Sequence, residues 1–597
     1  MDLPSKGALE IARPGGEVKD ITIGMVGSGG DGVISAGEFL VTAAANEGLY
    51  SYLLKAFGPQ IRGGESSCRV RISDHHLYTH GIGLDVLVVF NWKDFMKMKS
   101  ELVIKDGIFI IYEEKDPTPE DEIPIDPSIN RTVCRIPLSK LAMDLGGSAL
   151  AKNMVTLGII AEAFHLPSDG LRQALRDKFQ RKGEKVVASN IAALEGGMSY
   201  AREHLRDVPV WLDYIGGTPK MAITGNEALS AGALYAGCRF YAGYPITPST
   251  ENLEWMAHEL PKFGGTCIQA EDELAAIAML VGASFSGAKA MTSTAGPGLS
   301  LMTEALGLAS MAELPMVVVN CQRTGPSTGI PTKPEQSDLY QALFSAHGDA
   351  PRPVLAPISV FDCFRIAVEA FNIAEAFQTP VIVLSDQLIA QRKVSVDRID
   401  PRRLAVHNRK QPAAGNLEGY KRFELTDDGI SPMALPGTKG GAYVASGIEH
   451  DETGEPTSSG VLHRKMNQKR INKLEPLREW SNLVMNFGHE NATVGAISWG
   501  SSVNVLREVQ VRLAEQGMHF RIIAPSILYP LPTRVLQSFV DAMDKLLILE
   551  MSEMGQFYHY LRMHLDLPAD KVKTYYRSGG RVFSVFEIED EMRGLLS

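Results

Sequence analysis

The sequence lacks closely spaced cysteines. Its six cysteines stand far apart and form no CxxC or similar pair: Cys68, Cys134, Cys238, Cys267, Cys321 and Cys363. Zinc sites and iron–sulfur clusters usually draw their ligands from such pairs. The spacing therefore argues against a metal site in this chain and predicts reduced, mostly buried thiols in a cytoplasmic protein.

Two further features are missing, namely a basic block and a long apolar run. The formal net charge is −11, and no cluster of Lys and Arg could neutralise a phosphate backbone. Apolar runs such as residues 86–90 have the length of a strand, far below the ~20 residues of a membrane-spanning helix. The first 16 residues show no apolar core of a secretory signal. We therefore expect no nucleic-acid partner and no membrane.

What the chain does contain is a repeated order of strand, glycine-rich turn and helix. With 597 residues it is too long for one core, since domains usually have about 100–200 residues. The alternation predicts an α/β fold with three α/β domains and mainly parallel sheets. The expected boundaries are an N-terminal extension at 1–19, a Rossmann-like domain at 20–205, a linker at 206–220, a second domain at 221–395, a long connection at 396–490 and a third domain at 491–597.

Two motifs of the first domain favour anion binding. Gly27-x-Gly29-x-x-Gly32 lies between an expected strand and helix, where dinucleotide folds bind phosphate. The acidic residue that holds a nicotinamide ribose about 20 positions later is missing, so a tight turn or another anion site is favoured over NAD. Arg62 stands in GPQIRGGESS, between a glycine and a glycine pair, and is either an anion ligand or an exposed loop residue.

The second domain has four small-residue or polar segments at ends of expected strands. They are YPITPST at 244–250, QAEDELAA at 269–276, TSTAGPG at 292–298 and NCQRTGPSTGIPT at 320–332. The two prolines stiffen the first segment, and Ser249 or Thr250 is expected to cap the following helix. Arg323 follows an apolar strand, at the edge where open α/β sheets bind ligands.

Three acids stand at the start of the expected helix 273–286, namely Glu271, Asp272 and Glu273. Dipole complementarity at a helix start explains acids there equally well. Neighbouring residues on a helix are separated by about 100°, so the three cannot all face the same way. Glu273 begins the stripe that includes Ala276 and Ile277, and we expect it to point into packed protein while the other two lie in the turn.

These motifs, in order and spacing, resemble 2-oxoacid:ferredoxin oxidoreductases. The second-domain segments resemble the alpha subunit, GSGGDG followed by GPQIRGGESS resembles the gamma subunit, and the end of the chain resembles a transketolase C-terminal domain. The resemblance implies a gamma–alpha fusion in which 20–205 is the gamma domain, 221–395 the pyrimidine-binding domain of a thiamine diphosphate site, and 491–597 the transketolase C-terminal-like domain.

The family's functional residues map onto several positions here. The resemblance implies that Glu273 activates thiamine diphosphate by a hydrogen bond to its aminopyrimidine, and that Tyr244, Pro245, Ile246 and Thr247 line the cofactor site. Thr247 and Arg323 would hold the substrate, with Arg323 clamping its carboxylate. A beta subunit would supply the diphosphate-binding half, Mg²⁺ and a [4Fe-4S] cluster, in an α2β2 assembly that uses coenzyme A and ferredoxin.

The resemblance is strongest to members that act on 2-oxoglutarate, giving succinyl-CoA and CO₂ in a reversible reaction. Their substrate carries a second carboxylate, for which Arg62 or Lys333 is the candidate cation. Pyruvate and branched-chain 2-oxo acids are the alternatives within the family. Outside it, the chain would be a non-catalytic docking subunit or an NAD-dependent dehydrogenase.

Overall fold

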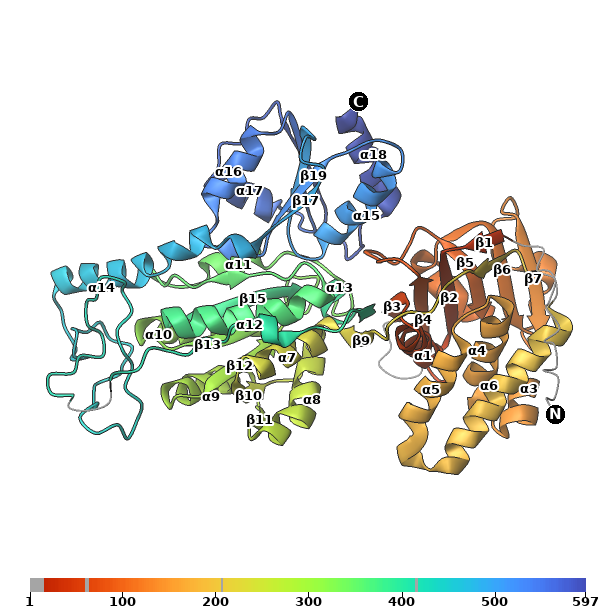
Figure 1. The fold of residues 1–597 in the computed structure, drawn as a ribbon, viewed down its shortest axis with the longest axis horizontal. Helices are drawn as coiled ribbons and strands as arrows, with labels where there is room; N and C mark the ends of the chain where they lie inside the picture. Colours follow the sequence, from red (N-terminus) through yellow and green to blue (C-terminus); the bar gives the residue numbers. More distant parts are fainter. Residues whose placement is uncertain (1–15, 59–63, 206–207, 414–416) are drawn as a thin grey trace, which may run out of the picture. The chain divides into compact units, whose positions relative to one another are not determined.

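The computed structural model describes residues 16–58, 64–205, 208–413 and 417–597. Two compact units emerge, each described by itself below: 1–223 with 392–399, and 224–391 with 400–597. The predicted α/β class with three α/β sheets is confirmed (Figure 1). None of the helices in the described residues combines the length and apolar character needed to cross a bilayer.

Unit 1 is built on an eight-stranded sheet in the order β7-β6-β5-β2-β4-β3-β16-β9. Its elements are β1 Gly16–Val18, β2 Asp20–Ser28, α1 Val33–Asn46, β3 Tyr50–Phe57, β4 Glu65–Ser73, β5 Leu84–Val89, α2 Trp92–Met98, β6 Ile104–Glu113, β7 Arg131–Ile136, α3 Leu138–Gly146, α4 Lys152–Ala163, α5 Ser168–Phe179, α6 Glu184–His204, β8 Val210–Leu212, β9 Met221–Thr224 and β16 Lys393–Val396.

The expectation of a mainly parallel sheet was wrong for half of unit 1. Strands β2, β5, β6 and β7 run parallel, but β4 is antiparallel to both of its neighbours, β2 and β3. The segment expected to be a linker also contains β8, which pairs with β1. Strand β3 alternates little between polar and apolar residues, so period-2 patterning did not reveal it.

Alternate residues of the parallel strands divide unit 1 into two cores. Val86 and Val88 pack with α1, α4, α5 and α6 on one face, whereas Leu87 and Val89 pack with α2 on the other. This period of two follows from the opposite directions of successive side chains on a strand. Both faces are covered, and the carboxyl ends of β2, β5 and β6 lie at one edge of the sheet.

Unit 2 contains a seven-stranded sheet, β11-β10-β12-β13-β15-β14-β20, and a five-stranded one, β17-β19-β18-β21-β22. Its elements are α7 Gly225–Tyr235, β10 Cys238–Gly243, α8 Thr250–Glu259, β11 Thr266–Gln269, α9 Glu273–Phe285, β12 Lys289–Thr294, α10 Gly296–Met311, β13 Met316–Gln322, α11 Leu339–Phe344, β14 Val354–Leu355, α12 Val360–Phe377, β15 Pro380–Asp386, α13 Gln387–Ala390, α14 Gly460–Asn472, β17 Val484–Gly488, β18 Val494–Ser498, α15 Ser502–Ala514, β19 Arg521–Pro525, β20 Ile527–Tyr529, α16 Thr533–Asp541, β21 Lys545–Glu550, α17 Gln556–Arg562, β22 Val572–Tyr576 and α18 Val585–Leu596.

The two sheets of unit 2 are joined by one hydrophobic core and by a buried glutamine. Strand β20 from the C-terminal part pairs with β14 of the larger sheet. The Gln336 side chain donates to the Trp499 carbonyl (2.8 Å) and accepts from the Met551 backbone N–H (2.9 Å). Glu550, the last residue of β21, accepts from two backbone N–H groups at the start of α17. These polar contacts fix the C-terminal sheet against the loop that leads to α11.

The long connection packs against unit 2 at the amino ends of the strands. Arg409 forms a buried ion pair with Glu375 (2.6 Å) and donates to the carbonyls of Ser284 and Ala288, which precede β12. Lys469 of α14 pairs with Glu313, just before β13. These contacts lie at the edge of the sheet opposite to the carboxyl edge where the motifs lie.

Candidate active site

All four motifs of the second domain meet at the carboxyl edge of the seven-stranded sheet. Residues 244–250 follow β10, the acidic segment follows β11, the GPG turn follows β12, and Arg323 follows β13 directly. These strands are parallel neighbours, so their carboxyl ends lie side by side. Open α/β sheets bind ligands at this edge, and the local sequence of strand and turn places the polar residues there.

Arg323 and Thr247 lie in direct contact. The Arg323 Nη1 donates to the Thr247 carbonyl (2.6 Å), although the residues are far apart in sequence. Arg323 is 7% exposed, and its Nε has no hydrogen-bond partner among the described residues. Burial lowers the pKa of Arg323, and the nearby Asp338 opposes that shift. A buried guanidinium with an unused N–H is prepared to bind an anionic group.

The loop that carries Thr247 is held from below by buried amides. Asn226 of α7 donates to the Pro248 carbonyl (2.9 Å), and Asn252 of α8 donates to the Asn226 side-chain oxygen (2.8 Å). Ser249 occupies the N-cap position of α8, but its backbone is helical, so its hydroxyl donates to the Ile246 carbonyl instead of capping the helix. Nothing in the motif itself indicated Asn226, because its role depends on a helix distant in sequence.

Only one of the three acids points inward. Glu273 is the first residue of α9 and is 5% exposed, whereas Glu271 is exposed. Asp272 is the N-cap, and its side chain accepts from the Ala275 N–H (2.7 Å). The Thr294 hydroxyl lies 3.4 Å from the Glu273 carboxylate and donates to it. The chain therefore offers one buried carboxylate at the head of α9.

The GPG turn is shaped around Glu273. A Cβ added to Gly298 would lie 2.4 Å from the Glu273 Oε1 and 2.0 Å from the Thr294 Oγ1. Only glycine allows this approach, so the carboxylate rests against bare backbone at the start of α10.

The remaining predicted site residues have different surroundings. Tyr244 is 41% exposed, and Pro245 and Ile246 are partly buried in the same loop. Lys333 closes the loop that starts at Arg323: its carbonyl accepts from the Thr324 N–H (2.9 Å). Arg62 lies outside the described residues. Within those residues, no three His, Cys, Asp or Glu side chains come together as metal ligands.

Helix α9 has a largely apolar sequence, and several of its apolar side chains are exposed. Leu274 is 54% exposed and Met279 38%, and Leu301 on the neighbouring α10 is 46% exposed. Helices α9 and α10 pack against each other, so the three exposed side chains belong to neighbouring helices, and α9 begins at Glu273. We call the surface of Leu274, Met279 and Leu301 the α9–α10 face. The largely apolar sequence of α9 therefore does not mean that every face of this helix is buried.

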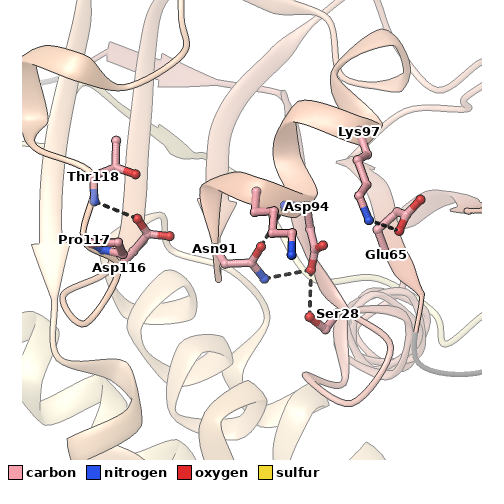
Figure 2. A pocket seen from close by; sticks show the side chains of 9 residues that line it. Ser28, Glu65, Asn91, Asp94, Lys97, Asp116, Pro117 and Thr118 are labelled. Carbon is pink, nitrogen blue, oxygen red and sulfur yellow. Dashed lines mark hydrogen bonds and ion pairs between the residues drawn. The ribbon is translucent and has the colours of Figure 1, made fainter.

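Unit 1 contains a polar cavity of about 630 Å³ at the carboxyl ends of β2, β5 and β6 (Figure 2). Two lysines, Lys93 and Lys97, are among its lining residues, and its acids already have partners. Asp94 accepts from Ser28 and Asn91, Asp116 from the Thr118 N–H, and Glu65 pairs with Lys97. The first of the predicted glycine motifs, Gly27–Gly32, ends in the left-handed Gly32 (φ 74°) at the start of α1.

Comparison with known proteins places the chain in a family. Residues 231–469 match the model for the thiamine-diphosphate-binding part of pyruvate flavodoxin/ferredoxin oxidoreductases, and residues 22–200 match the pyruvate ferredoxin/flavodoxin oxidoreductase model. The alpha subunit of 2-oxoacid:ferredoxin oxidoreductase 2 from Aeropyrum pernix is 33% identical over 77% of this chain and 73% of its own length. The chain belongs to the alpha subunits of 2-oxoacid:ferredoxin oxidoreductases.

Two further relatives, both named for 2-oxoglutarate, are similar to this chain. The 2-oxoglutarate synthase subunit KorA of Archaeoglobus fulgidus is 40% identical over 55% of this alpha subunit and 87% of its own length. The solved 2-oxoglutarate:ferredoxin oxidoreductase of Magnetococcus marinus, with 2-oxoglutarate, coenzyme A and succinyl-CoA bound, superposes with a TM-score of 0.90. That match has 39% identity and covers 97% of this chain and all of the other. The predicted family is confirmed.

Proposed function

We propose that this alpha subunit takes part in the oxidative decarboxylation of 2-oxoglutarate to succinyl-CoA and CO₂, with ferredoxin as electron acceptor. The observation that carries the proposal is the meeting of Glu273, Thr247 and Arg323 at one sheet edge. A buried carboxylate and a buried guanidinium are the two charges that this chemistry needs from the chain. Both relatives that narrow the likeness act, by their names, on 2-oxoglutarate.

Each residue has a separate task in this proposal. Glu273, which lies against Gly298, would hold a proton at the N1′ nitrogen of the cofactor's aminopyrimidine. Arg323 binds the substrate's 1-carboxylate, and the loop Tyr244–Thr247 lines the cofactor side of the site. When bound, thiamine diphosphate supplies the electron sink for loss of CO₂.

The distal carboxylate of 2-oxoglutarate needs a second cation, and Lys333 is our candidate among the described residues. The loop from Arg323 to Lys333 is closed by two Thr324–Lys333 hydrogen bonds, from the backbone N–H and from the hydroxyl. The Lys333 side chain also packs against Gly580 of the C-terminal part, where an added Cβ would lie 2.4 Å from the Lys333 Cβ. The loop is therefore fixed at both ends, which suits a residue that binds the distal carboxylate at a set distance from Arg323.

The α9–α10 face supports a partner subunit that completes the cofactor site. Large apolar side chains exposed on the helix that begins at Glu273 and on its neighbour α10 are costly in water, because burial of each is worth about 1.5–3 kcal/mol. We propose that the beta subunit, which would bring the diphosphate-binding half, Mg²⁺ and the [4Fe-4S] cluster, covers this face in an α2β2 assembly.

The polar cavity of unit 1 is our proposed site for the nucleotide end of coenzyme A. Lys93 is the lining cation for which no acidic partner is found among the described residues, since Lys97 is paired with Glu65. The cavity lies beside a glycine turn and the start of α1, a place that attracts phosphate. Asn91 and Thr118 add neutral polar groups suited to a base or a ribose.

The function is tested with the chain co-expressed with its iron–sulfur partner. Reduction of ferredoxin is measured with 2-oxoglutarate, pyruvate and a branched-chain 2-oxo acid, each with and without coenzyme A. We expect a kcat/KM for 2-oxoglutarate at least about tenfold above the others, since one buried charge pair is worth about 2–5 kcal/mol. A preference for pyruvate would contradict the substrate, and reduction of NAD by the chain alone would contradict the reaction class.

Two variant pairs test the partner face and the coenzyme A site. Leu274→Asp should prevent co-purification of the partner, whereas Val511→Asp, on the similarly exposed α15 surface, should not.

Lys93→Ala should raise the KM for coenzyme A and leave the KM for 2-oxoglutarate unchanged, and Lys140→Ala is its matched control. An unchanged KM for coenzyme A in Lys93→Ala would remove the cavity from the proposal.

A further inference from the structure

The GPG turn is gripped by carboxyl groups on both sides. Glu273 lies against Gly298, and Asp338, from the loop before α11, lies against Gly296. A Cβ added to Gly296 would lie 2.8 Å from the Asp338 Oδ2. The family motifs include Glu273 but leave Asp338 without a task, although it stands at the same short turn.

The orientation of Asp338 is not explained by helix capping. It occupies the N-cap position of α11, yet its side chain accepts no hydrogen bond from that helix. Its carboxylate instead accepts from the Asn320 Nδ2 (2.9 Å), and its own N–H donates to the Gln322 side-chain oxygen (3.1 Å). Asp338 is thus turned toward the end of β13, the strand that carries Arg323.

Asp338 also carries the negative charge that acts on Arg323. The carboxylate stabilises the cationic form of Arg323, and Arg323 in turn favours the ionised form of Asp338. The second charged group that acts on Asp338 is Glu335 of the same loop, which repels it. The start of α10 contributes Gly296 and Ser300, and α17 contributes the neutral Gln556 to this loop, so neither element adds a charge there.

We propose that Asp338 is a positioning residue that serves as the counter-charge of Arg323 in the free enzyme and takes up a proton when the substrate carboxylate replaces it. This rests on the proposed function. The proton comes from solvent and no covalent bond changes. The fully buried Asn320 Oδ1 has no partner among the described residues, and it can accept from the protonated carboxyl. The substrate anion then meets one guanidinium without a competing negative charge.

The proposal sets the direction of a pH effect. Burial raises the pKa of Asp338 to about 6, Asn320 opposes the rise, Glu335 adds to it, and Arg323 lowers it. A bound substrate anion favours the neutral form, so binding is coupled to proton uptake above that pKa. The KM for 2-oxoglutarate should therefore rise with pH above 6, approaching about tenfold per pH unit.

The test compares wild type, Asp338→Asn and Asp349→Asn in the complex with the partner subunit. KM is measured from pH 5.5 to 8, and proton uptake on 2-oxoglutarate binding is measured at pH 7.5 by calorimetry in two buffers of different ionisation enthalpy. We expect about one proton for wild type and for Asp349→Asn. Asp338→Asn should take up none and show a flat KM profile with little change in kcat.

A second variant keeps the proposal testable if Asp338→Asn does not fold. Glu335→Gln removes the negative charge that raises the pKa of Asp338, so the break in the KM profile should move to lower pH. The wild-type slope retained in Asp338→Asn, or an unmoved break in Glu335→Gln, would overturn the role of Asp338. Absence of turnover with every 2-oxo acid would instead refute the proposed function, and the calorimetric proton count would still decide on Asp338.

Discussion

The two edges of the seven-stranded sheet use buried charge in opposite ways. At the amino edge, Glu313 is paired with Lys469 (2.6 Å) and Lys473 (2.8 Å), and all three side chains are about 1–2% exposed. At the carboxyl edge, Arg323 has an unused Nε, and Asp338 is ionised only at some cost. Paired charges hold the long connection in place, whereas incompletely paired charges are available to a substrate.

This difference between the two edges shows where incompletely paired buried groups are tolerated. A buried group without a partner costs free energy, and native proteins keep such groups mainly at functional sites. At the amino edge, burial would raise the pKa of Glu313, but Lys473, Lys469 and Arg422 together hold it well below its usual range. The first edge stabilises the fold, and we propose that the second performs the chemistry. Variants at each edge should therefore affect different measurements.

The largest effect is expected at the head of α9. Glu273→Gln preserves shape but cannot share a proton with the cofactor, so turnover should fall by roughly 10²–10⁴ while the assembly and its cofactor content stay normal. Cofactor C2-proton exchange and overall turnover are the measurements, and Glu271→Gln is the exposed neighbouring control. Full activity in Glu273→Gln would place the family alignment out of register in this segment.

Removal of the central charge at the amino edge should affect stability and not turnover. Glu313→Gln leaves Lys469 and Lys473 buried without their counter-charge, which we expect to cost about 3–5 kcal/mol of unfolding free energy. The kcat of the folded fraction should be unchanged. Denaturant unfolding and turnover are measured on the same preparation, and a normal midpoint would show that the connection is held by other contacts.

The same group predicts an acid limit. Because the pKa of Glu313 is lower in the folded than in the unfolded chain, its contribution is complete above about pH 4.5 and is lost as pH falls further. Wild type should lose unfolding free energy more steeply below that pH than Glu313→Gln. Parallel curves for the two proteins would exclude Glu313 as the cause.

A smaller effect is expected for the carboxylate clamp. Arg323→Ala removes a largely buried charge, which should weaken use of the 2-oxo acid by about 2–5 kcal/mol in kcat/KM and leave cofactor binding nearly normal. The apparent affinities for the 2-oxo acid and for thiamine diphosphate are compared. A change below about threefold in the former would remove Arg323 from substrate binding.

The smallest effect is expected at the cap. Asp272→Asn keeps a side-chain oxygen for the Ala275 N–H, whereas Asp272→Ala loses it and should cost about 1 kcal/mol of stability. Neither variant should lower turnover more than about tenfold, because Asp272 points away from Glu273. A loss in Asp272→Asn larger than that in Glu273→Gln would exchange the two roles.

Part of the fold could be predicted because helices and turns depend mainly on residues close together in the sequence. The expected helix at 273–286 is α9, which spans Glu273–Phe285. The inward direction of Glu273 followed from the 100° step of a helix. The antiparallel β3–β4 pair was missed, because pairing direction depends on partners and not on the strand's own pattern.

The sequence by itself determined the order of elements, the cap at Asp272, the single inward acid and the family. Tertiary structure alone decided which side chains meet: Arg323 with Thr247, Asp338 with Asn320, and Glu313 with lysines more than 150 positions away. Local preferences act over one or two turns of backbone, so they fix turns and helix faces. Buried polar contacts form between distant segments, and they are specified only when packing excludes water from both partners.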